Sequence, residues 1–209
     1  MNEETIHSRY IIAVLMTLLV TVACNGFTSS FSKDASIVHT EQIGFGFVNH
    51  TINSLEGDHN APNHLFLHKY PMPGDGFISD VIFLDDSDEM PEIITLLILR
   101  PDREGWLIVH NVPIPDDDLS TSTSGIWTLA LPSPLPVKKG DIFAHWQPQS
   151  RPTGPVPLNV GTYSIDGLSV GRVGFSADDL EIGQVISEVG FTGPRDYAIN
   201  LLLTPKASN

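Results

Sequence analysis

The chain has 209 residues, enough for one domain with a sizeable core, and it carries 25 Asp and Glu against 11 Lys and Arg, a formal net charge of −14. A surface of that charge repels nucleic-acid phosphates and anionic lipid headgroups, so we expect no nucleic-acid partner and no electrostatic adsorption to membranes. The single cysteine excludes an intramolecular disulfide, so packing or bound ions must hold the domain together.

The first element is an uncharged apolar run from Tyr10 to Ala23. It is shorter than the roughly 20 apolar residues that cross a bilayer, so we expect residues 1–23 to be a signal peptide or an anchor. Thr21, Val22 and Ala23 directly precede Cys24, and this pattern resembles the lipobox of bacterial lipoproteins. The resemblance implies cleavage before Cys24, lipidation of its thiol and a membrane-anchored protein at the cell surface. Ordinary secretion after cleavage near Ala23 is the alternative.

Residues 24–40 are rich in Ser and Thr without periodicity, which predicts a flexible tether. From 41 to 204 short runs of alternating apolar and polar residues lie between Gly- and Pro-rich turns, which predicts roughly ten short strands and no helix. Residues 205–209 form a tail. The predicted strands are 42–48, 64–70, 77–84, 93–99, 106–112, 126–131, 141–147, 162–165, 171–175, 184–189 and 197–203.

Two of these runs are apolar on both faces. Residues 93–99, IITLLIL, have almost no polar position, and residues 141–147 carry apolar or aromatic side chains at both odd and even positions. Strands of this kind are covered on both sides. We therefore expect 93–99 at the centre of the core, and 141–147 in a central strand or under a loop.

Residues 131–157, which surround the predicted strand 141–147, contain the turns that redirect the chain. Three prolines at alternate positions between 131 and 137 cannot donate to a sheet ladder, which predicts a strand end running into an extended edge or loop. Lys138-Lys139-Gly140-Asp141 is predicted to be a polar turn with Gly140 at positive φ. Residues 147–157 are predicted to be a surface loop.

A V-x-x-G-D turn, a hydrophobic strand, a Gly/Pro loop and an R-x-Y-x-I-N strand follow one another in this half of the chain. The positions concerned are Val137, Gly140, Asp141, Pro157, Arg195, Tyr197, Ile199 and Asn200. This series resembles a jelly-roll-like β-sandwich module of extracellular proteins, over about residues 75–203. The resemblance implies an all-β, antiparallel sandwich more than an activity, and such modules mostly serve adhesion or ligand binding at cell surfaces.

Three acidic clusters are candidates for a calcium site, because calcium takes six to eight oxygen ligands that loops at the ends of a sandwich can gather. None has the spacing of an EF-hand loop, and solvated turn residues are the alternative interpretation. The candidate ligands are Asp85, Asp86, Asp88, Asp116, Asp117 and Asp118, and the third cluster is Asp178, Asp179 and Glu181.

His59, His64 and His68 have a spacing that could ligate a transition metal. If 64–70 is a strand, however, His64 and His68 lie about 13 Å apart on one face, too far to share an ion. We therefore expect loop and surface histidines.

Aromatic residues could supply a platform on which a sugar ring stacks. Trp106 and Trp127 are expected in the core, where large aromatic side chains usually lie. Trp146, beside the Pro/Gly loop, and Tyr163 are the candidate ligand-binding residues.

Local catalytic signatures such as G-x-S-x-G, H-E-x-x-H and the P-loop do not occur, so we expect no enzyme. The leading hypothesis is a surface-displayed or secreted binding or adhesion module for a glycan or protein ligand. A structural subunit of an extracellular assembly is one alternative. A polysaccharide hydrolase is another, because its two carboxylates would meet only in space. The ligand and the oligomeric state stay open.

Overall fold

The computed structural model describes residues 39–47, 55, 64–84, 94–114, 120–121, 126–147, 156–160, 169–173, 180–187, 191–193 and 195–207. Contacts divide the chain into two units, Met1–Val38 and His39–Asn209, and every described residue belongs to the second. All regular structure in these ranges is β-strand, as the short alternating runs predict.

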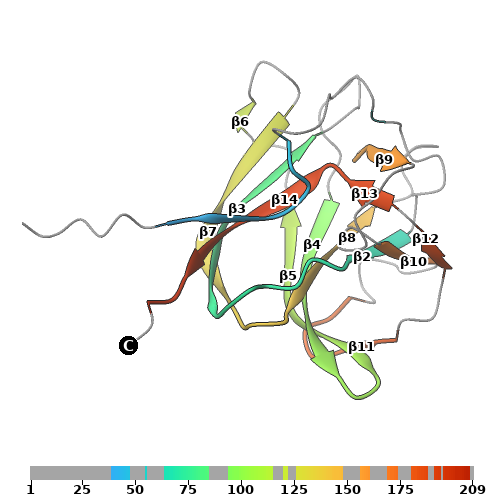
Figure 1. Cartoon of the computed structure of the whole chain (residues 1–209). Coiled ribbons are helices and arrows are strands. Elements are labelled where there is room, and N and C mark those ends of the chain that lie inside the picture. The colour runs from blue at the N-terminus through green and yellow to red at the C-terminus, as the bar shows by residue number, and fades with distance from the viewer. Residues whose placement is uncertain are drawn as a thin grey trace, which may run out of the picture. The chain divides into compact units, whose positions relative to one another are not determined.

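Two antiparallel sheets pack as a sandwich (Figure 1). The five-stranded sheet has the order β1 (Glu41–Gly44), β14 (Ile199–Pro205), β3 (Gly76–Leu84), β7 (Ile126–Val137) and β6 (Ser120–Thr121). The seven-stranded sheet has the order β11 (Val185–Ile186), β5 (Gly105–Ile114), β4 (Ile94–Asp102), β8 (Ile142–Gln147), β2 (His64–His68), β10 (Ser169–Val173) and β12 (Phe191–Gly193). A separate pair joins β13 (Arg195–Tyr197) to β9 (Leu158–Val160).

The chain crosses repeatedly between the sheets. One sheet contains the order β1-β14-β3-β7 and the other the order β2-β8-β4-β5. These two interleaved four-strand orders are the double Greek key of a jelly roll. The predicted all-β, jelly-roll-like sandwich is therefore confirmed.

The main core lies between the sheets, where alternate residues of both point inward. Ile78, Val81 and Phe83 of β3 meet Leu96 and Ile98 of β4 in this cluster. Each such side chain contributes about 1.5–3 kcal/mol when fully buried.

A second apolar cluster covers the outer face of the seven-stranded sheet. Leu97 and Leu99, the alternate residues of β4, belong to it together with Leu180 and Ile186 from the segment that includes β11. Both faces of β4 are thus enclosed, which confirms the prediction from its unbroken apolar run. β8 is enclosed in the same way and lies between β4 and β2, so its predicted central position is also confirmed.

The proline-rich segment is the extended edge that was predicted, but it is not the end of a strand, because β7 continues to Val137 instead of ending at Leu131. Pro136 pairs with Phe77 of β3, while the partner on the other side of β7, β6, reaches only Trp127 and Thr128. Among the described residues, the prolines therefore occupy a stretch of β7 that pairs along one side only. That position suits residues without an N–H donor.

Candidate functional site

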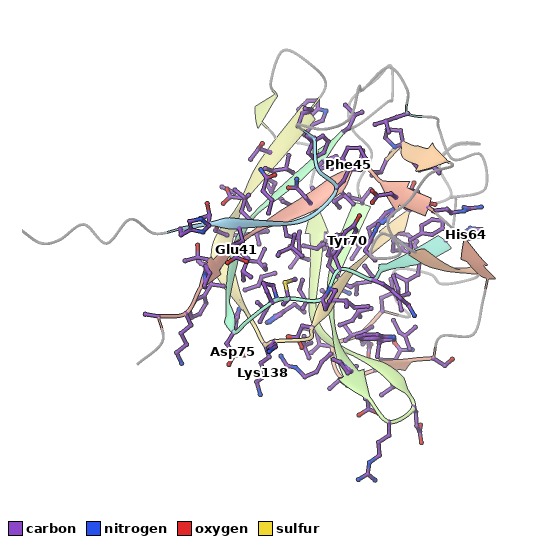
Figure 2. All side chains as sticks on the ribbon, viewed as in Figure 1. Glu41, Phe45, His64, Tyr70, Asp75 and Lys138 are labelled. Carbon is purple, nitrogen blue, oxygen red and sulfur yellow. The ribbon has the colours of Figure 1, made fainter. Side chains whose placement is uncertain are left out.

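A pocket of about 370 Å³ opens at the end of the five-stranded sheet where β3 begins and β7 and β14 finish, beside β4 and β5 of the other sheet. The volume is at the small end of the roughly 300–1,000 Å³ of ligand pockets. Figure 2 shows Asp75 and Lys138 at this end. The residues that line the pocket are Asp75, Gly76, Phe77, Arg100, Val109, His110, Pro136, Val137, Lys138 and Lys206.

The turn at residues 138–141 contributes Lys138 to the pocket lining. Gly140 has a φ of 87°, as predicted, and Asp141 N–H donates to the Lys138 carbonyl at 3.0 Å. The turn is fixed to the loop before β3, because Gly140 N–H donates to the Met72 carbonyl and Met72 N–H donates to the Asp141 carbonyl. These hydrogen bonds fix the backbone of the turn that carries Lys138.

Asp141 holds Arg100 in a bidentate ion pair beneath this turn. Arg100 Nε donates to Oδ1 of Asp141 at 2.9 Å and Nη2 donates to Oδ2 at 2.8 Å. The Asp141 side chain is 1% exposed, and its Oδ2 also accepts the Lys138 N–H. These hydrogen bonds raise the pKa of Arg100; partial burial opposes the rise and the charges of Asp141 and Asp75 add to it.

Arg100 is consequently oriented before any ligand arrives. A guanidinium has five N–H donors in a planar fork, and Asp141 takes two of them. The remaining donors belong to a side chain that is 30% exposed and lines the pocket. Such a group can accept a carboxylate without first losing its own conformational freedom.

Asp75 joins the turn to the end of β14. Its carboxylate accepts the Lys139 N–H at 2.9 Å, and its carbonyl accepts the Lys206 N–H at 2.9 Å. The backbone next to both pocket lysines is therefore anchored on one residue, while neither lysine side chain forms an ion pair within the described residues.

The pocket differs in charge from the rest of the chain. Arg100, Lys138 and Lys206 face one carboxylate, Asp75, in the lining, whereas the whole chain has a net charge of −14. Charges further than about 8 Å away are largely screened at physiological ionic strength. Because buried Asp141 balances Arg100 at close range, the three local cations face two carboxylates, Asp75 and Asp141, and leave an excess of one positive charge.

The lining also has an apolar side. Phe77 is 42% exposed, which is unusual for a large hydrophobic residue in this fold, and Val109 and Pro136 lie in the same lining. His110 Nε2 lies 2.9 Å from the Pro136 carbonyl oxygen and ties β5 to β7 across the two sheets. The pocket thus offers cations, a carboxylate and an aromatic face together.

A second polar group is sealed in the main core. His68 Nε2 lies 2.6 Å from His145 Nδ1, and His145 Nε2 lies 2.6 Å from the side-chain amide of Gln147. The Gln147 amide nitrogen donates to His145 Nε2, so a neutral His145 carries its proton on Nδ1 and donates it to His68 Nε2. A neutral His68 then carries its own proton on Nδ1, and both imidazoles are uncharged. The chain ends on His68 Nδ1 and Gln147 Oε1, which are buried without a hydrogen-bond partner in the described ranges.

Burial decides the charge of this pair. It lowers the pKa of His68 to about 3 and that of His145 well below its usual value, and for His145 the neighbouring His68 adds to the effect. Both rings are 1% exposed or less, so a solvent-borne substrate cannot reach them. The pair is a structural element of the core.

Two positions singled out in the sequence differ from their predicted environment. Trp146 was a candidate ligand-binding residue beside the Pro/Gly loop but is 8% exposed, in the outer apolar cluster, because even-numbered residues of β8 face that cluster. His68 was expected to be a surface histidine but lies in the core, because β2 is a strand inside its sheet, between β8 and β10. Trp106 and Trp127, predicted in the core, are only partly buried and pack against the outer and the main cluster respectively.

The other predicted site residues lie outside the described residues. They are Cys24, the proposed lipidation site, Tyr163, His59, and the candidate calcium ligands Asp85, Asp86, Asp88, Asp116, Asp117, Asp118, Asp178 and Asp179. Glu181 of the third cluster is described and exposed. No group of three or more His, Cys, Asp or Glu side chains that could hold a metal occurs in the described part of the chain.

Comparison with known protein families, curated proteins and solved structures found no match to this chain. Within the described residues there is also no helix of the length and apolar character needed to cross a membrane.

Proposed function

We propose that this protein is a binding module, secreted or displayed at a cell surface, that holds its ligand in the pocket at the end of the sandwich. The observation that supports the proposal most is the cation Arg100, fixed by buried Asp141 and directed into a cavity of ligand size. Fixing a charged side chain in advance reduces the entropy lost on binding, which is typical of recognition sites.

The ends of a jelly roll suit this role. Strands of two sheets converge there, so side chains far apart in the sequence meet on a rigid frame. The lining draws on β3, β4, β5 and β7, on Asp75 just before β3, and on the residues just after β7 and β14. A glycan or an exposed part of a protein would enter from solvent, past Phe77 and the two lysines. No step of covalent chemistry is needed.

A glycan array combined with size-exclusion chromatography tests this function. We expect the array to show binding to a restricted set of glycans. The elution volume of the protein should be the same with and without ligand. Backbone amide shifts on titration should centre on Phe77, Arg100 and Lys138. Ligand-independent oligomers without retention would instead favour a structural subunit, and release of reducing sugars from polysaccharides would favour a hydrolase.

A further inference from the structure

We infer that the ligand of this pocket is a sugar acid, a saccharide residue that carries a carboxylate on its ring. The inference rests on the proposed binding function and specifies its ligand class. It follows from three different surfaces in one cavity, each of which matches one part of such a molecule.

The cationic side matches the carboxylate. Arg100 keeps its outer N–H donors for the pocket, and a guanidinium edge binds a carboxylate with two parallel hydrogen bonds. Lys138 and Lys206 add two mobile ammonium groups to the same lining. An anion in the pocket would therefore contact one fixed cation, Arg100, and two lysine ammonium groups whose side chains can adjust.

The acidic side matches hydroxyl groups. Asp75 uses one carboxylate oxygen for the Lys139 N–H, and a carboxylate has about four acceptor positions in all. A negative group in the same cavity disfavours a compact dianion such as phosphate or sulfate. It favours a ligand whose charge lies at one end and whose hydrogen-bond donors lie at the other.

The apolar side matches a sugar ring. The exposed face of Phe77, with Val109 and Pro136 beside it, can cover the C–H face of a pyranose. The cavity of about 370 Å³ limits the bound part to a small unit, so one acidic residue of a longer glycan would occupy it.

The experiment compares methyl β-D-glucuronide with methyl β-D-glucoside, which differ only in the carboxylate. Kd values come from backbone amide shifts at low and high NaCl. We expect the glucuronide to bind about tenfold more tightly at low salt, and most of that advantage to vanish at high salt.

Three lysine variants localise the effect. Lys138→Gln and Lys206→Gln should each weaken glucuronide binding several-fold, while Lys139→Gln, which removes the same charge from a neighbouring residue outside the lining, should not. Phe77→Ala should weaken both sugars alike. All four side chains are exposed, so the folded spectrum should persist.

Three results would overturn the inference. Equal Kd values for the two sugars, with amide shifts at the pocket, would exclude a sugar acid as the specific ligand class and leave the proposed binding function unaffected. Acetate binding as tightly as the glucuronide would reduce the site to a simple carboxylate site. If neither sugar shifts the pocket amides while the glycan array shows retention elsewhere, the inference also fails.

Discussion

His68 of β2 and His145 of β8 share a 2.6 Å hydrogen bond inside the sandwich, between Nε2 of the first ring and Nδ1 of the second. Phe143 stacks on His68, Phe66 stacks on His145, and Tyr197 meets both rings edge-on. An aromatic enclosure of this kind stabilises two neutral imidazoles and penalises a charged one. The pair therefore makes folding sensitive to pH.

The free energy of unfolding should fall as the pH drops below about 6.5, the histidine pKa in the unfolded chain. Because burial lowers the folded-state pKa of both rings, the unfolded chain binds protons first. The loss should continue toward the folded-state pKa of His68, about 3, with a limiting slope of about 1.4 kcal/mol per pH unit for each histidine. Urea unfolding at pH 7.5, 6.5, 5.5 and 5.0 measures it before most carboxylates titrate.

A triple variant tests whether the pair causes this slope. Replacing His68, His145 and Gln147 together by Leu removes the whole polar chain, so the slope between pH 7.5 and 5.0 should largely disappear. His39→Gln, at an exposed histidine, is the matched control and should keep it. An unchanged slope in the triple variant would assign the acid sensitivity to other groups.

The sequence could predict these strands but not which side chains meet. Alternation in 141–147 places His145 on one face, and the two-sided apolar pattern indicates burial. It says nothing of His68, which is 77 residues away in sequence. Strand pairing depends on the order of the sheet, and a jelly roll sets strands distant in the chain beside each other. Three charged residues of the pocket, Arg100, Lys138 and Lys206, were missed as a site for the same reason.

One signal for the pocket was present in the chain. Asp141 follows a glycine turn and directly precedes a strand that is apolar on both faces. This position indicates that its carboxylate is buried. A buried carboxylate needs a cation or several N–H donors. Arg100, directly after the other two-sided apolar run, was a reasonable partner, although spacing alone could not establish contact between residues 41 apart.

Asp141→Asn should destabilise the protein by about 1–3 kcal/mol, because it leaves the Arg100 guanidinium without its counter-charge. The value should lie below that of a fully buried pair, since the Arg100 side chain is 30% exposed. Arg100→Met in the Asp141→Asn background should add little, and this double-mutant cycle by urea unfolding measures the coupling. Fully additive effects would mean that the two residues act independently.

Gly105→Ala should destabilise the protein by at least about 2 kcal/mol. Gly105 has a φ of +145°, and a Cβ there would lie 2.2 Å from the carbonyl oxygen of Ile186, so β11 would have to move away from β5. Gly74→Ala, where a Cβ meets nothing within 4 Å, is the control and should be nearly neutral. Thermal unfolding distinguishes them, and equal melting temperatures would contradict the close contact.

Trp146→Phe should lower stability without changing binding, whereas Phe77→Ala should weaken binding with little change in stability. Trp146 is 8% exposed in the outer cluster, so its truncation should lower the free energy of unfolding by about 1–3 kcal/mol and leave ligand affinity at the pocket unchanged. Phe77 is 42% exposed in the pocket lining, so its truncation should weaken binding at little cost in stability. Urea unfolding and sugar titration of both variants measure the two effects. Loss of binding in Trp146→Phe with Phe77→Ala unaffected would move the ligand to the outer face of the seven-stranded sheet.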